Sequence, residues 1–66
     1  MSETEILKAE IKKLSAKATQ AKMDLHDLSE ELPVNWQSIL EVAQRAHGAF
    51  ALLEKKRSEL KQLETA

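Results

Sequence analysis

The sequence predicts an all-α fold: an antiparallel two-helix hairpin that self-associates into a four-helix bundle. Three observations lead to this prediction. Ala, Leu, Glu and Lys dominate the composition, with one Gly, one Pro and no Cys, which is typical of helical proteins. Apolar residues recur at the heptad spacing of packed helices. A proline and an asparagine stand close together near the middle of the chain and indicate a turn.

The first helix is predicted over about residues 3–32. Ser2 followed by Glu5 is a capping-box pattern, in which side chains satisfy free backbone donors at the helix start. Pro33 disfavours helical geometry at the preceding residue and so ends the helix. The apolar seam alternates steps of four and three residues and consists of Leu7, Ile11, Leu14, Ala18, Ala21, Leu25, Leu28 and Leu32.

The turn is predicted at residues 33–35 and the second helix over about 36–63. Asn35 is expected to be the N-cap, with Val34 packing on Ile39 as a hydrophobic staple and Trp36 covering the end of the core against Leu32. Two long helices joined by so short a turn must lie antiparallel, within a single domain spanning 1–66. The apolar positions of the second helix are Ile39, Val42, Ala43, Ala46, Ala49, Phe50, Leu53, Leu60 and Leu63.

The second helix has more apolar surface than one neighbour can cover. One stripe runs through Val42 and Leu53 and another through Ala43 and Phe50, so two neighbours are expected. The simplest arrangement is a two-fold dimer of hairpins, with a tetramer as the alternative. Docking head to tail would bring the acidic turn end of one hairpin beside the basic open end of the other.

Composition argues against several classes of protein. A formal net charge of −1 gives no basic excess for neutralising phosphates, so nucleic acid is not an expected partner. No apolar run approaches a membrane span and no signal core precedes the helix, so a cytoplasmic protein without a membrane partner is expected. The sequence contains no nucleophile–base constellation, and we expect the protein not to be an enzyme.

The outer side of the first helix carries the residues that packing does not explain: Met23, Asp24, His26, Asp27 and Glu30. His26, Asp27 and Glu30 are at helical spacing and are predicted ligands for a divalent transition metal, completed by His47 or by a second chain. Met23, Asp24, His26 and Asp27 are predicted to form a patch that binds another protein. The alternatives are two solvated histidines and an ordinary surface methionine.

The stretch KATQAKMDLHDLSEELP followed by NW resembles a small helical-hairpin family, Rop-like, associated with nitrogen fixation. The resemblance covers about residues 7–63. It implies a self-associating hairpin encoded in nitrogen-fixation gene clusters and also suggests a capacity to bind metal. The residues that carry it are Lys17, Ala18, Thr19, Lys22, Met23, Asp24, Leu25, His26, Asp27, Leu28, Leu32, Pro33 and Trp36.

We therefore predict a non-enzymatic accessory protein of nitrogen fixation that acts by protein–protein interaction or metal binding in nitrogenase maturation or protection. A nitrogenase-assembly protein is the expected partner beside the second copy of the chain. Two alternatives stay open. One is a purely structural oligomeric module, and the other is RNA binding of the Rop kind, which the mixed charges of the first helix disfavour.

Overall fold

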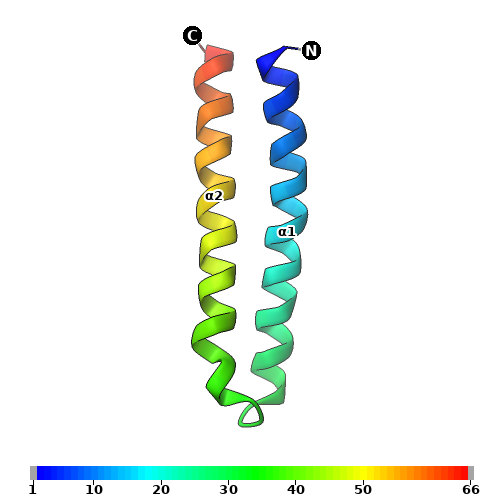
Figure 1. Cartoon of the computed structure of the whole chain (residues 1–66), viewed down its shortest axis with the longest axis vertical. Helices are drawn as coiled ribbons and strands as arrows, with labels where there is room; N and C mark the ends of the chain where they lie inside the picture. The colour runs from blue at the N-terminus through cyan, green and yellow to red at the C-terminus, as the bar shows by residue number, and fades with distance from the viewer. Residues whose placement is uncertain (1, 66) are drawn as a thin grey trace.

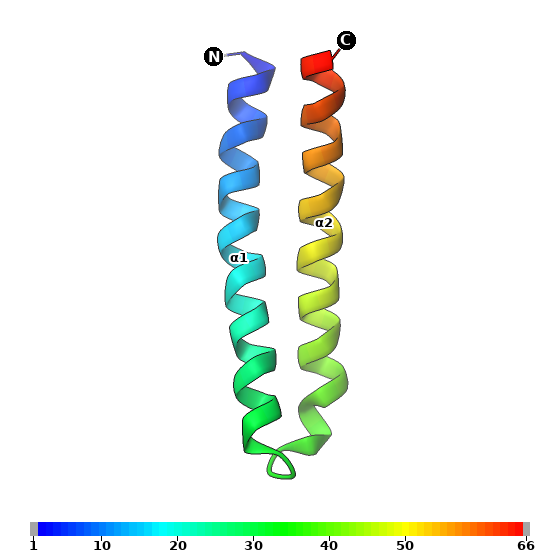
Figure 2. The same ribbon diagram turned by 180° about the vertical axis from the view of Figure 1, so that it is seen from behind.

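The computed structural model describes residues 2–65, so the predicted domain 1–66 extends one residue beyond it at each end. Helix α1 spans Glu3–Glu31, a short 3-10 helix η1 spans Trp36–Ser38, and helix α2 spans Ile39–Thr65. The two long helices lie side by side and antiparallel (Figure 1). The N-terminal end of α1 lies beside the C-terminal end of α2, and the turn joins the two helices at the opposite end (Figure 2). The hairpin measures 49 × 16 × 13 Å, and the predicted all-α hairpin is confirmed.

The N-terminus of α1 is capped as its sequence indicates. The Ser2 hydroxyl oxygen accepts a hydrogen bond from the backbone N–H of Glu5 at 3.2 Å, and the Ser2 carbonyl accepts one from Ile6 N–H at 3.1 Å. At the other end, Leu32 has φ −55° and ψ 141°. That extended geometry is the one expected before Pro33, and it ends α1 at Glu31.

Asn35 shapes the turn through its backbone rather than through its side chain. Its φ of 62° places it in the left-handed region, and the structure shows no capping hydrogen bond from its side chain. Asn35 therefore occupies the N-cap position of η1, but the expectation that it caps the second long helix is wrong. Asparagine tolerates left-handed geometry better than most residues, and its carbonyl accepts from Ser38 N–H at 2.9 Å. Residues 36–38 form the 3-10 turn, so α2 begins three residues later than expected.

The core is a narrow line of apolar side chains between the helices. Within residues 2–65, the buried apolar side chains are Leu7, Ala18, Leu28, Val42, Ala46 and Leu53. All six belong to the predicted seams, whose large and small residues alternate along the contact. The outer sides are charged, and neither α1 nor α2, over the described residues, has an apolar stretch long enough to cross a membrane.

Lys56 stands at a seam position of α2 that the apolar pattern skips. It follows Leu53 by three residues and precedes Leu60 by four, and its side chain is 29% exposed. The Nζ atom lies 3.5 Å from Glu10 Oε2 on α1 and 3.6 Å from Glu59 Oε2 on α2. A charged residue at a single seam position disfavours other registers, because any shift would leave it unpaired.

The single hairpin does not cover the apolar residues near its turn. Trp36 is 59% exposed, and Val34 and Leu40 are exposed as well. The expectation that Trp36 covers the end of the hairpin core is therefore wrong for one chain. The left-handed backbone at Asn35 and the 3-10 turn after it place this ring outside the seam.

Substitution of Ala18 tests the close packing of the two helices. Its side chain is 1% exposed, so Ala18→Leu should overpack the seam and lower the free energy of unfolding by about 1–3 kcal/mol. The matched control is Ala51→Leu, on the exposed side of α2. Urea denaturation followed by circular dichroism measures both, and equal stability of the two variants would contradict the placement of the seam.

Substitution of Asn35 tests the left-handed backbone geometry of the turn. Valine is strained in left-handed geometry, so Asn35→Val should lower the free energy of unfolding by about 1–2 kcal/mol. Glycine adopts this geometry freely, so Asn35→Gly should stay close to the parent protein. Thermal denaturation distinguishes the pair. A destabilised Gly variant would instead mean that the asparagine side chain contributes a contact of its own.

Candidate functional site

His26 lies on the outer side of α1, one to two turns before the helix ends. Its Nε2 atom is 3.1 Å from Glu30 Oε1, and its Nδ1 atom is 3.8 Å from Asp27 Oδ1. All three side chains are about two-thirds or more exposed, at 68%, 67% and 73%. The structure therefore brings the three predicted metal ligands together as an imidazole between two carboxylates, open to solvent.

Asp24 and Met23 occupy different parts of the surface. Asp24 is half-buried, and one carboxylate oxygen accepts a hydrogen bond from Gln20 Nε2 at 3.0 Å. Met23 is 54% exposed. The predicted partner patch is thus divided, with Met23 and His26 facing outward and Asp24 tied to the preceding turn of α1.

One chain does not provide a complete metal centre within residues 2–65. No group of three or more His, Asp or Glu side chains there is arranged to hold a metal ion. His47 lines a separate hollow on α2 with Leu40, Ala43 and Gln44. His26 with its carboxylates is therefore a partial ligand set, and a metal would need further donors from another molecule or from solvent.

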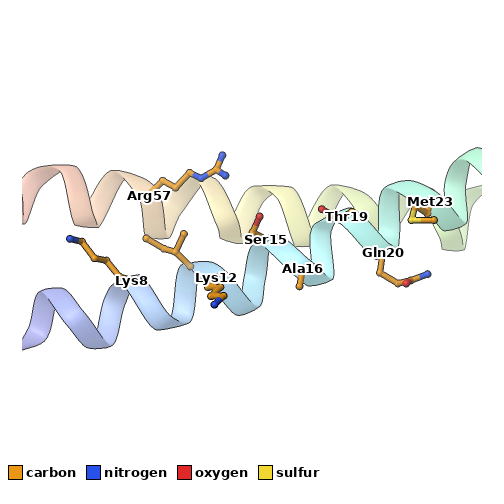
Figure 3. A pocket seen from close by; sticks show the side chains of 9 residues that line it. Lys8, Lys12, Ser15, Ala16, Thr19, Gln20, Met23 and Arg57 are labelled. Atoms are coloured by element: carbon orange, nitrogen blue, oxygen red, sulfur yellow. The ribbon is translucent and has the colours of Figure 1, made fainter. Parts of the chain in front are cut away.

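A groove on α1 is the largest of the hollows described in the hairpin. It is open to solvent and has a volume of about 600 Å³. Figure 3 shows Lys8 and Lys12 at one end, the small residues in the middle, Met23 at the other end, and Arg57 on the neighbouring helix α2. The residues lining it are Lys8, Ile11, Lys12, Ser15, Ala16, Thr19, Gln20, Met23 and Arg57.

The groove continues the surface that holds His26. Lys12, Ala16, Thr19, Met23, His26 and Glu30 follow one another at steps of four, three, four, three and four residues. This spacing places them along one outer stripe of α1, distinct from the apolar seam. Sequence reasoning did not assign Ser15, Ala16 or Thr19 to a site, because small and polar residues are weak signals. The second heptad stripe was the signal that could have found Ala16 and Thr19.

Charge is distributed unevenly along the hairpin. Residues 24–47, around the turn, contain five Asp and Glu but a single Arg and no Lys. The other residues contain nine Lys and Arg against six Asp and Glu. The turn half is therefore acidic and the open half mildly basic, although the whole chain is nearly neutral. Such asymmetry influences how two molecules orient when they meet.

The fold and these outer features define a small helical hairpin without an enclosed pocket among the hollows described, and with exposed surfaces suited to contact. The chain belongs to the Rop-like family, whose model matches residues 2–65. The resemblance seen in the sequence is thereby confirmed.

Relatives in other bacteria support this assignment. A UPF0437 protein of Azorhizobium caulinodans is 67% identical over 64 residues, covering 97% of this chain and 93% of that protein. A protein of Frankia alni, described as a UPF0437 protein in the nifX-nifW intergenic region, is 51% identical over 41 residues, covering 62% of this chain and 50% of that protein.

A solved structure shows the same hairpin. A protein determined by NMR at the Northeast Structural Genomics Consortium is 50% identical and superposes with a TM-score of 0.87. The match covers 98% of this chain and 93% of that one. The two-helix architecture is therefore common to both proteins.

Proposed function

We propose that this protein is a non-enzymatic accessory of nitrogen fixation that works as a self-associating helical module. The observation that carries the proposal is the amount of apolar surface left exposed by one hairpin. Phe50 is 44% exposed, and Leu52, on the opposite side of α2, is 43% exposed. Leu52 borders Leu14 and Lys17 of α1. Side chains of this size are stabilised by burial against a further helix pair.

The small size of the chain supports the same proposal. A hairpin of 66 residues has a modest core, and the chain has no cysteine for a disulfide. Chains of this length commonly gain the missing stability from oligomerisation. A dimer of hairpins would form a four-helix bundle, with a tetramer as the larger alternative.

The link to nitrogen fixation rests on gene position in a relative. The Frankia alni protein is described as lying between nifX and nifW. We extend that setting to this chain and infer that its partner beside a second copy is a protein of nitrogenase maturation or protection. Met23 and His26, which face outward, are available for such a contact.

Native mass spectrometry of the untagged protein tests self-association. Spectra across a concentration series should show an even-numbered oligomer that gives way to monomer on dilution. Phe50→Glu should shift the equilibrium toward monomer by at least about tenfold, since it places a charge in an apolar contact. A parent protein that stays monomeric at the highest concentration would overturn the proposal.

Growth on dinitrogen tests the biological setting. Deletion of the gene in a nitrogen-fixing host should slow growth on N₂ and leave growth on ammonium unchanged. The parent gene should restore growth, and a variant that fails to associate should not. Equal growth of the deletion strain on both nitrogen sources would contradict a role in nitrogen fixation.

Binding of a divalent transition metal is a second candidate function. It is favoured by the His26 imidazole, whose Nε2 atom lies 3.1 Å from Glu30 Oε1, so these two residues could bind one ion together. Asp27 lies 3.8 Å from the other ring nitrogen, Nδ1. Neutral imidazole and carboxylate groups are ordinary ligands for such ions. Because residues 2–65 of one chain hold only a partial ligand set, a second chain or solvent would complete the coordination.

Calorimetric titration with Zn²⁺ tests this candidate. His26→Ala should abolish binding while helicity is retained, because the side chain is exposed and does not support the core. His47→Ala, measured in parallel, reports whether that histidine supplies a further ligand. Binding that survives His26→Ala unchanged would exclude His26 as a ligand.

A further inference from the structure

We propose that the turn end of the hairpin binds a basic amphipathic segment of a partner protein, in which lysine or arginine stands beside apolar side chains. This surface, the turn surface, consists of exposed apolar residues with acidic residues around them. Its apolar residues are Leu32, Val34, Trp36, Ile39 and Leu40. The inference rests on the proposed contact with a partner protein and names the chemistry of that partner, and it is independent of self-association.

The apolar side chains of the turn surface are open to solvent. Leu40 is 82% exposed, Val34 is 62% exposed and Trp36 is 59% exposed. Soluble proteins seldom expose several large apolar side chains at one end of the molecule unless that end contacts another molecule. Tryptophan is also enriched among the residues that contribute most to protein interfaces. The turn surface therefore has the composition of a binding site.

The backbone of the turn is ordered by its own hydrogen bonds. Val34 N–H donates to the Glu31 carbonyl at 3.0 Å, and Trp36 N–H donates to the Pro33 carbonyl at 3.3 Å. The exposure of Val34 and Trp36 thus belongs to a defined turn conformation. A binding surface that is already ordered loses less conformational entropy when its partner binds.

The turn lies beyond the ends of both long helices, as Figure 1 and Figure 2 show. Helices that pack side by side cover one another along their lengths. A further helix pair along α1 and α2 would therefore cover the sides of the hairpin rather than the turn at residues 33–36. This end is available to a partner in the single hairpin and in a bundle.

Acidic side chains around the turn surface determine which partner it attracts. Residues 24–47 contain five Asp and Glu, a single Arg and no Lys. Glu31 precedes Leu32 and Glu41 follows Leu40, and both glutamates are exposed. Charges of one sign attract a partner of the opposite sign and repel one of the same sign. A basic segment is therefore favoured over anionic lipid or nucleic acid.

The C-terminal end of α1 has an excess of negative charge that a basic partner would offset. Its last turn contains no basic residue and includes Glu30 and Glu31. Because a helix C-terminus carries partial negative charge, carboxylates are unfavourable there and cations are favourable. Glu31 forms no ion pair within residues 2–65. A lysine or arginine of the partner would supply the missing cation.

Fluorescence of Trp36, the single tryptophan of the chain, provides a direct test. The probe is an amphipathic peptide of leucine and lysine without tryptophan, and the control peptide has glutamate at every lysine position. The lysine peptide should shift the emission to shorter wavelength, because it buries the exposed ring. The glutamate peptide should bind at least about tenfold more weakly. No shift with the lysine peptide, or equal binding of both peptides, would overturn the inference.

Leu40→Ser tests the apolar part of the turn surface. It should weaken binding of the lysine peptide about tenfold and retain helicity, because this side chain is exposed and lies outside the core. The matched control is Leu52→Ser, at an exposed leucine further along α2, which should bind as the parent does. An equal loss in both variants would mean that the peptide adheres to any apolar surface, and would overturn the inference.

Glu31→Lys separates a role in binding from a role in stability. A lysine at the C-terminal end of α1 should raise the thermal unfolding midpoint. The same change should weaken binding of the lysine peptide about tenfold, because it reverses a charge beside the turn surface. Glu54→Lys, at an exposed position outside residues 24–47, is the control and should bind as the parent does. Unchanged binding by Glu31→Lys would overturn the inference.

Other occupants of the turn surface give different results. A shift of Trp36 emission caused by phosphatidylglycerol vesicles would identify an anionic membrane and overturn the inference. A shift that follows oligomer formation in the protein alone would mean that another copy covers the turn, which would overturn the inference and leave self-association standing. A protein that stays monomeric and binds the lysine peptide would support the inference and overturn self-association.

Discussion

A pair of helices can bury only the stripe along which they touch, and this limit governs the whole molecule. The seam that closes the hairpin runs from Leu7 to Leu28 on α1 and from Val42 past Leu53 on α2. Ala18, nearly inaccessible to solvent, lets the backbones approach. Every apolar side chain off this line remains in water until another helix covers it.

In so narrow a core, the register of the two helices is set by a residue that departs from the apolar pattern of the seam. Apolar seams slide easily because one leucine replaces another with little change in free energy. Lys56 interrupts the seam of α2 and reaches Glu10 on α1 at 3.5 Å. The contribution of such a half-exposed pair to stability is modest. Its effect on register is larger, since a shifted hairpin would bury the lysine without a partner.

The outer surface of α1 combines features that suit contact with another molecule. Small residues, a methionine and a histidine–carboxylate pair follow one stripe, and the charges at its two ends differ in sign. A surface that only had to dissolve would carry mixed charges without this order. The arrangement explains why a foreign partner and a metal both arise as candidates for the same stretch.

The helical class, the antiparallel hairpin, the capped start at Ser2 and the membership in the Rop-like family all followed from residue pattern, because heptad spacing and local capping act over a few residues. Of the candidate site, the sequence alone placed His26, Asp27 and Glu30 together, since residues four apart share a helix face. Other features depend on how the two helices meet in space. The exposure of Trp36, the partial burial of Lys56 and the groove around Thr19 arise from the path of the turn and the way the two helices pack together. Those are long-range properties, and no window of local sequence contains them.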